Sequence, residues 1–129
     1  MSACPADRRR GFTLIELLVV MSIIALLLAI AVPRYMSRLK NSRETVLQQT
    51  LAVTRDALDK FYADSGKYPD TLDRLVSAKY LRNLPFDPIT ESTTTWILVP
   101  PEDPEKGVVY DLHSGADGKG RDGRPYREW

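Results

Sequence analysis

The chain has 129 residues, of which 27% are charged and 43% hydrophobic, and these are ordinary values for a soluble domain. Its formal net charge of +1 argues against a generally basic nucleic-acid-binding protein. Fewer than 100 residues follow the apolar N-terminal segment. This length excludes a two-lobed enzyme, a doubly wound nucleotide-binding domain and a (β/α)8 barrel.

The apolar segment from Phe12 to Val32 contains 21 residues and a single charge, Glu16. About 20 apolar residues are enough for a helix to cross a bilayer. Arginines occupy positions 8–10 directly before it, which predicts a cytoplasmic N-terminus and an external C-terminal part. A carboxylate in such a segment is unfavourable and indicates a functional partner, although the side chain can also extend to the membrane interface.

A secretory signal peptide is the first alternative for this segment. Its apolar core usually has about 7–15 residues and ends at a cleavage site between small residues. Residues 29–31, Ala-Ile-Ala, have the composition of such a site. The greater length of the apolar run and the presence of Glu16 favour a segment that is retained.

The run Gly11-Phe12-Thr13-Leu14-Ile15-Glu16, preceded by arginines, resembles the type III signal of the type IV pilin superfamily. The resemblance implies that a prepilin peptidase removes residues 1–11 as a leader, cutting between Gly11 and Phe12, and that Phe12 is then N-methylated. Residues 12–33 would remain as a transmembrane and filament-core helix. Glu16 would neutralise the Phe12 amine of a neighbouring subunit, and such a buried pair fixes register more than it adds stability.

A single helix from Phe12 to about Ser65, kinked near Pro33, is predicted by the spacing of apolar residues and by the stop at Gly66. The face expected to be buried comprises Met36, Leu39, Arg43, Val46, Leu47, Thr50, Val53, Thr54, Ala57, Leu58 and Phe61. The opposite face, with Glu44 and Arg55, is expected to face solvent. Such a helix would be about 80 Å long, too long for the remaining chain to cover. Its N-terminal half must therefore contact lipid or other copies, with a simple membrane anchor as the alternative.

The remaining residues, 34–129, are predicted to form a periplasmic globular domain. The expected elements are a short helix from Thr71 to about Ala78 capped by Asp70, strands over 93–99 and 107–112, a loop over 113–123 and a third, edge-like strand over 124–129. The fold class is α+β: a long N-terminal helix, membrane-spanning in its first half, packed on a small antiparallel sheet as in pilins.

Features after the helix resemble the major pseudopilins of type II secretion systems, the G-type subunits. They are Tyr68-Pro69, the Leu-Pro-x-Asp-Pro run at 84–88, the Ser-Gly-Ala-Asp-Gly run at 114–118 and Trp129. The resemblance implies a structural subunit of a periplasmic pseudopilus that assembles through its N-terminal helix and helps to drive protein export. The implied partners are copies of itself, minor pseudopilins, the prepilin peptidase, an inner-membrane assembly platform with its secretion ATPase and, indirectly, an outer-membrane secretin.

The same resemblance implies a calcium ion in the C-terminal loop, with Asp117 and Asp122 as candidate ligands. Calcium prefers hard oxygen ligands, and glycines let backbone carbonyls turn inward. Only five positions separate the two aspartates, a shorter loop than the family pattern. The alternative is that both Asp-Gly pairs are ordinary turn residues.

Two other functions were weighed. A type IV pilin or minor pilin, for adhesion, motility or DNA uptake, shares the N-terminal signal. Basic residues at 121, 124 and 127 alternate with acidic ones, which does not favour nucleic-acid binding. An enzyme is not expected, because Cys4 and His113 are single residues of their kind and the chain has no phosphate-binding Gly-x-x-x-x-Gly-Lys run.

Overall fold

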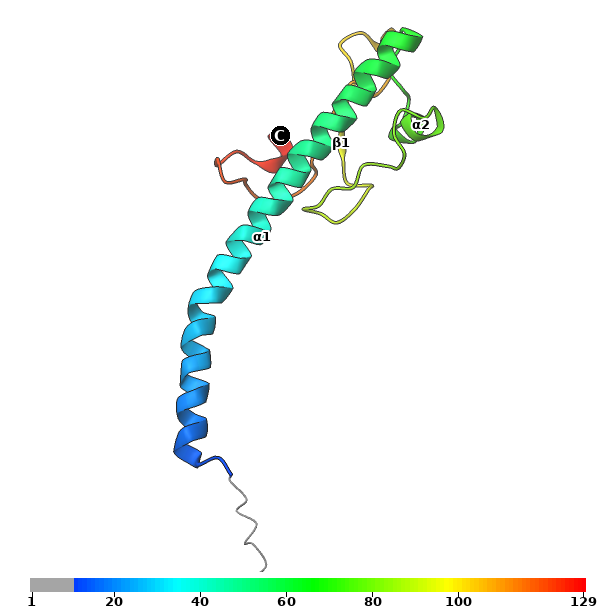
Figure 1. Cartoon of the computed structure of the whole chain (residues 1–129). Helices are drawn as coiled ribbons and strands as arrows, with labels where there is room; N and C mark the ends of the chain where they lie inside the picture. The colour runs from blue at the N-terminus through cyan, green and yellow to red at the C-terminus, as the bar shows by residue number, and fades with distance from the viewer. Residues whose placement is uncertain (1–10) are drawn as a thin grey trace, which may run out of the picture. The chain divides into compact units, whose positions relative to one another are not determined.

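The computed structural model describes residues 11–129; residues 1–10, which make up all but the last residue of the predicted leader, lie outside the described part. The elements in chain order are α1 (Leu14–Ser65), α2 (Leu72–Ser77), β1 (Ile97–Val99), the 3-10 turn η1 (Pro104–Lys106), β2 (Asp111–His113) and the 3-10 turn η2 (Tyr126–Glu128). The chain divides into two compact units, one ending at Arg38 and the other spanning Leu39–Trp129 (Figure 1).

Helix α1 confirms the long helix that the sequence predicts. The helix is continuous through Pro33. It stops at Gly66, which has a φ of +74° and donates its N–H to the Tyr62 carbonyl at 2.8 Å. Glycine adopts this left-handed conformation without a Cβ penalty, so it ends the helix where the sequence indicates.

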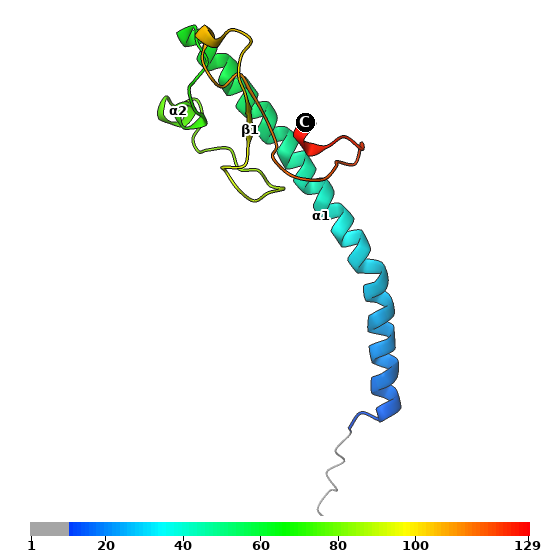
Figure 2. The same cartoon turned by 180° about the vertical axis from the view of Figure 1, so that it is seen from behind.

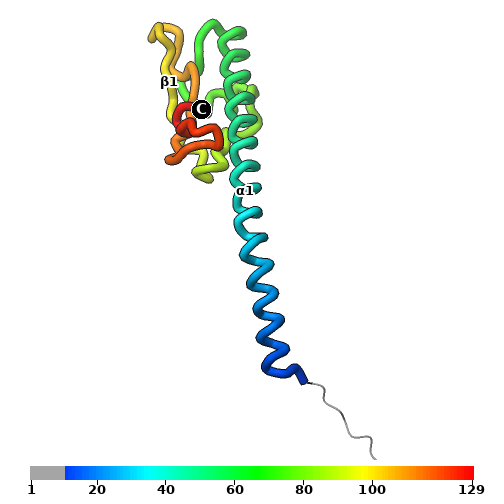
Figure 3. The backbone as a smooth tube through the Cα atoms, turned by 90° about the vertical axis from the view of Figure 1, so that its left-hand side faces the viewer, coloured from blue at the N-terminus to red at the C-terminus, as the bar shows by residue number. Residues whose placement is uncertain are grey.

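The hydrophobic core lies in the second unit, against one face of α1. This face contributes Leu47, Leu51, Ala57, Leu58 and Phe61, and the rest of the core comes from later segments, including Leu72, Leu75, Trp96, Val109 and Leu112. Figures 2 and 3 show these segments running back along the C-terminal part of the helix. The core thus holds the chain after Gly66 onto a single helix.

The predicted buried face of α1 was wrong at several positions. Met36, Val46 and Val53 are exposed by 58%, 47% and 55%. Glu44, expected in solvent, is only 4% exposed. The apolar period alone misplaced the face because the C-terminal segment covers Glu44 with hydrogen-bonding groups, which hydropathy does not register.

The sheet is antiparallel, as predicted, but has two short strands. β1 pairs with β2 in the register Ile97↔His113, Leu98↔Leu112 and Val99↔Asp111. The arrangement is the α+β, pilin-like combination of a long helix and a small sheet. The strand predicted over 107–112 begins four residues later, and the loop predicted from His113 begins one residue later.

Two further predictions were wrong in detail. α2 begins at Leu72 with Thr71, rather than Asp70, as its extended N-cap residue, and Thr71 makes no side-chain cap bond. The third strand is instead η2, in which Glu128 N donates to the Pro125 carbonyl at 3.0 Å. Its three-residue period places Tyr126 and Trp129 on one side, where their rings meet edge to face at 5.3 Å.

Candidate processing and assembly site

The start of α1 is a capping box built by two residues of the N-terminal signal. Glu16 donates its backbone N–H to Thr13 Oγ1 at 3.1 Å, and Thr13 N–H points back to Glu16 Oε2 at 3.5 Å. Leu17 N donates to the Thr13 carbonyl at 3.1 Å, which makes Thr13 the N-cap. The sequence analysis missed this role, although the Thr-x-x-Glu spacing is its signature.

The Gly11–Phe12 bond lies outside the helix. Both residues are exposed, Phe12 by 84%, and no atom lies within 4 Å of the position of a Gly11 Cβ. The capping box sets the first helical residue at Leu14, so the Gly11–Phe12 peptide bond is exposed and lies before the helix. The predicted cleavage site therefore has suitable local geometry, while the cut itself is untested.

Glu16 keeps its carboxylate at the exposed N-terminal turn of the helix. There it lies near the positive end of the helix dipole, and only Thr13 in its own chain bonds to it among the described residues. The structure thus shows a local role for Glu16. Its predicted pairing with the Phe12 amine of a neighbour stays a prediction.

The apolar segment of α1 has no core of its own. The large apolar side chains from Phe12 to Val32 are each exposed by 44% or more. Within residues 11–129, α1 is the one helix that is long and apolar enough to cross a membrane by length and composition. An apolar surface on every side of a helix requires lipid or other protein around it.

The two motifs that carried the resemblance to pseudopilins meet in the second unit. Asp87, from the Leu-Pro-x-Asp-Pro run, is fully buried and accepts the Ser114 hydroxyl at 2.5 Å. Its other oxygen accepts the backbone N–H of Ile89 at 2.8 Å and of Thr90 at 3.3 Å. Ser114 in turn accepts the N–H of Ala116 at 3.2 Å. This network joins two loops 27 positions apart in the chain, a contact that neither motif revealed alone.

The C-terminal segment is fastened to α1 at two points. Glu44 accepts the Tyr126 hydroxyl at 2.8 Å and, more weakly, the Arg121 N–H at 3.4 Å. Arg55 donates to Asp111 at 2.7 Å and to the Trp129 carbonyl at 2.9 Å. Arg55 was expected to face solvent, but it is half-buried under these contacts.

His113 was expected on a surface loop, and this was wrong. It lies in β2, half-buried, and its Nδ1 bonds to the same Trp129 carbonyl that Arg55 holds. The histidine therefore supports the docking of the C-terminal segment.

The two predicted calcium ligands are each bonded to an arginine. Asp117 accepts Arg127 Nη2 at 2.9 Å, and Asp122 accepts Arg124 Nε at 2.8 Å. The latter bond holds the pKa of the Asp122 carboxyl below its usual value. No group of three or more His, Cys, Asp or Glu side chains suited to a metal occurs in the described range. As arranged here, the two carboxylates do not form a ligand set, and calcium stays a prediction.

Comparison with known proteins first defines the class. The profile of the prokaryotic N-terminal methylation motif matches residues 7–32. This span contains the predicted cleavage site, the capping box and most of the apolar segment, so the chain is a pilin-like protein with an N-terminal methylation signal.

Full-length relatives define the family. The type II secretion system core protein G of Escherichia coli K12 is 31% identical, over 88% of this chain and 86% of that protein. The core protein G of Pseudomonas aeruginosa is 36% identical, over 87% of both. The chain belongs to this family, and the resemblance to the G-type major pseudopilins is confirmed.

A further relative matches a shorter part of the chain. The prepilin peptidase-dependent protein D of E. coli K12 is 43% identical, over 52% of this chain and 45% of that protein. No solved structure matches the chain.

Proposed function

We propose that this chain is a structural subunit of a type II secretion pseudopilus, and not an enzyme. The single observation that carries the proposal is the match to core protein G along most of both chains. The exposed apolar surface of α1 supports it, because that surface needs partners and the chain offers it nothing to pack against among the described residues.

In this proposal the subunit passes through two stages, one in the membrane and one in the filament. It first lies in the inner membrane through residues 12–33, with the N-terminus in the cytoplasm and residues 34–129 in the periplasm. A prepilin peptidase then cuts after Gly11, and the apolar helices of many copies pack into a filament. Minor pseudopilins, the membrane platform and the secretion ATPase would act on that filament, and the secretin would receive the exported protein.

Filament packing gives Glu16 a second role in this proposal. A freed and methylated Phe12 carries a cationic amine, which is costly to bury without a counter-ion. Among the described residues the Glu16 carboxylate bonds only to Thr13, at 3.5 Å, a long contact that a charged partner outcompetes. Pairing across subunits would set the axial register of the helices.

The first test is the processing event. We expect the chain, produced in membranes with a prepilin peptidase, to begin at Phe12 and to carry one added methyl group by intact mass. The exposed Gly11 accepts a side chain without a clash. Gly11→Val should therefore abolish cutting by blocking the peptidase alone, while Ser37→Ala, at an exposed position outside the signal, should be cut normally. A chain that keeps residues 1–11, or is cut near residue 31, contradicts the proposal and favours the signal-peptide alternative.

Calcium binding in the C-terminal loop belongs to the proposal through the family resemblance. Both arginine–aspartate pairs are exposed, and exposed ion pairs add little to stability. A calcium ion is therefore able to compete with the arginines for the carboxylates. We expect calcium to raise the unfolding midpoint of the processed chain in detergent relative to chelator, and Asp117→Ala to abolish the rise. The matched control is Asp103→Ala, an exposed aspartate outside the loop. An equal unfolding midpoint with and without calcium would contradict calcium binding by this loop.

A further inference from the structure

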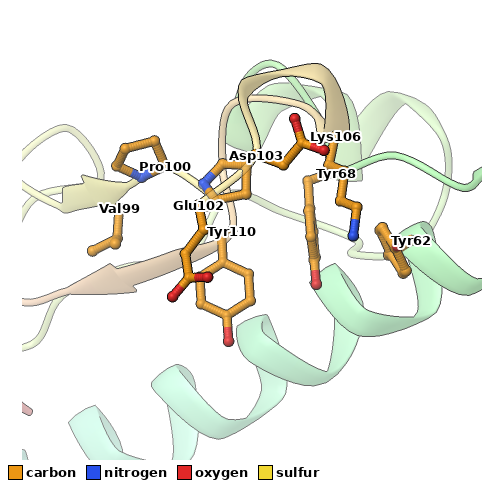
Figure 4. Close-up of a pocket in the computed structure, with 9 residues that line it drawn as sticks. Tyr62, Tyr68, Val99, Pro100, Glu102, Asp103, Lys106 and Tyr110 are labelled. Atoms are coloured by element: carbon orange, nitrogen blue, oxygen red, sulfur yellow. The ribbon is translucent and has the colours of Figure 1, made fainter.

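An open cavity of about 620 Å³ lies in the second unit, and no residue of the C-terminal loop lines it. It is lined by the end of α1, the residues after it and the loop that contains η1 (Figure 4). Three tyrosines, Tyr62, Tyr68 and Tyr110, form its aromatic wall, and Glu102 and Asp103 lie at its exposed rim. None of the functions discussed above uses these residues.

The three rings are arranged as a corner. Tyr62 and Tyr68 stack with centroids 4.5 Å apart and planes at 24°, and Tyr110 meets Tyr68 at 5.3 Å and 86°. Tyr110 remains 48% exposed. The face of a tyrosine ring carries partial negative charge and attracts a cation. Tyr62 and Tyr68 cover each other's facing sides, so the exposed Tyr110 ring is the part of the corner that a cation can reach.

The backbone holds this corner in place. Tyr68 N donates to the Lys106 carbonyl at 2.6 Å, and Tyr110 N donates to Val99 O at 2.9 Å. Gly107 has a φ of +120°, and a Cβ there would lie 2.3 Å from the Tyr68 carbonyl oxygen. Only glycine permits this close approach, so the loop is fixed against Tyr68 before any ligand arrives.

The charges around the corner favour a cation on its Tyr110 side. Glu102 and Asp103 take part in no ion pair within residues 11–129. Figure 4 shows the Glu102 side chain beside the Tyr110 ring and Lys106, the cation of the pocket itself, beside Tyr68. In the view of Figure 4, Lys106 lies toward Tyr62 and Glu102 lies toward Tyr110.

We propose that this pocket binds the guanidinium or ammonium group of a basic side chain, and that the group comes from a second copy of the chain. The candidate donor is the segment of α2 and the residues after it. Its exposed Arg74, Lys79 and Arg82 pair with no carboxylate in the described chain. A pocket on one copy and a basic segment on the next make a heterologous contact, which propagates as an open filament.

The pocket is tested on the processed chain in detergent micelles with methylguanidinium as the probe and methylurea as its neutral control. We expect a saturable shift of the Tyr68 and Tyr110 ring resonances with methylguanidinium alone, and the Tyr68 resonances report binding in the variant that lacks Tyr110. Glu102→Gln and Tyr110→Leu should each weaken binding about threefold, since each removes one cation contact. Glu105→Gln, next in the loop but outside the pocket lining, should bind as wild type. An equal response to methylurea, or unchanged binding by both variants, overturns the site.

The occupant is tested by charge reversal in filaments, and this part depends on the proposed function. Glu102→Arg and the combined Arg74→Glu, Lys79→Glu, Arg82→Glu variant should each lower filament yield at least about threefold. A chain that carries all four changes should recover the yield, and Glu105→Arg should not change it. Normal filaments from Glu102→Arg, or no recovery in the combined chain, overturn the second copy as occupant. Absence of filaments from the wild type overturns both the occupant and the proposed function, whereas the probe titration judges the pocket independently.

Discussion

At the residue scale, the least expected group is Glu44, a carboxylate that is 4% exposed on the helix face covered by the C-terminal segment. No cation pairs with it in the part of the chain that the structure describes. The Tyr126 hydroxyl, at 2.8 Å, is its main donor. Burial, and secondarily the contact with Glu44, raises the pKa of Tyr126 to about 12.

This shift predicts an alkaline loss of stability. Below about pH 10 the tyrosine is neutral in both states, so its contribution is fully present. Between pH 10 and 12 the unfolded chain ionises and the folded chain does not, so stability falls, by about 3 kcal/mol at most. Tyr126→Phe should flatten this fall in denaturant titrations followed by tryptophan fluorescence. The exposed Tyr110→Phe is the control, and an unchanged alkaline fall in Tyr126→Phe contradicts the assignment.

At the element scale, the sequence predicted the long helix and its stop well, and the strands poorly. α1 has a strong apolar signal and a glycine at its end, both of which are local. The threonine run before β1 has high strand propensity, yet its side chains bond locally: Thr90 to Thr95 at 2.6 Å and Ser92 to the Thr94 N–H at 3.1 Å. Such bonds compete with the sheet ladder, so β1 has only three residues.

Contacts between distant segments explain why the site could be predicted only in part. Gly11, Phe12 and Glu16 are neighbours in the chain, so their pattern indicates their place. The pairings of Glu44 with Tyr126 and of Asp87 with Ser114 span 82 and 27 positions. No local periodicity encodes such pairings, and a single sequence gives no other signal for them.

The Asp87–Ser114 network makes a prediction at this scale. Asp87→Ala leaves one buried and two half-buried donors without an acceptor, so we expect a loss of about 3 kcal/mol in the free energy of unfolding. Asp103→Ala removes a comparable aspartate bond, to Glu105 N at 3.0 Å, at an exposed position and should cost about 1 kcal/mol or less. Chemical denaturation compares the two. Equal losses of unfolding free energy in the two variants would show that the buried Asp87–Ser114 network stabilises the fold no more than an exposed cap does.

At the scale of the whole molecule, the two units differ in where their apolar side chains lie. The second unit buries its apolar side chains in a core of its own. The unit ending at Arg38 exposes its apolar side chains and, in the described residues, buries none. In the proposed function, lipid would satisfy such a surface before assembly and like helices afterwards, so the same segment would serve as membrane anchor and as filament core.

The most direct test of the account is electron microscopy of the chain after it has been processed by a prepilin peptidase together with an assembly platform and its ATPase. The account predicts helical filaments whose interior is formed by residues 12–33, and their loss in Glu16→Ala even when that variant is cut and methylated normally. Processed chains that stay as single membrane-anchored copies would contradict it and leave a simple anchor as the function of the apolar helix.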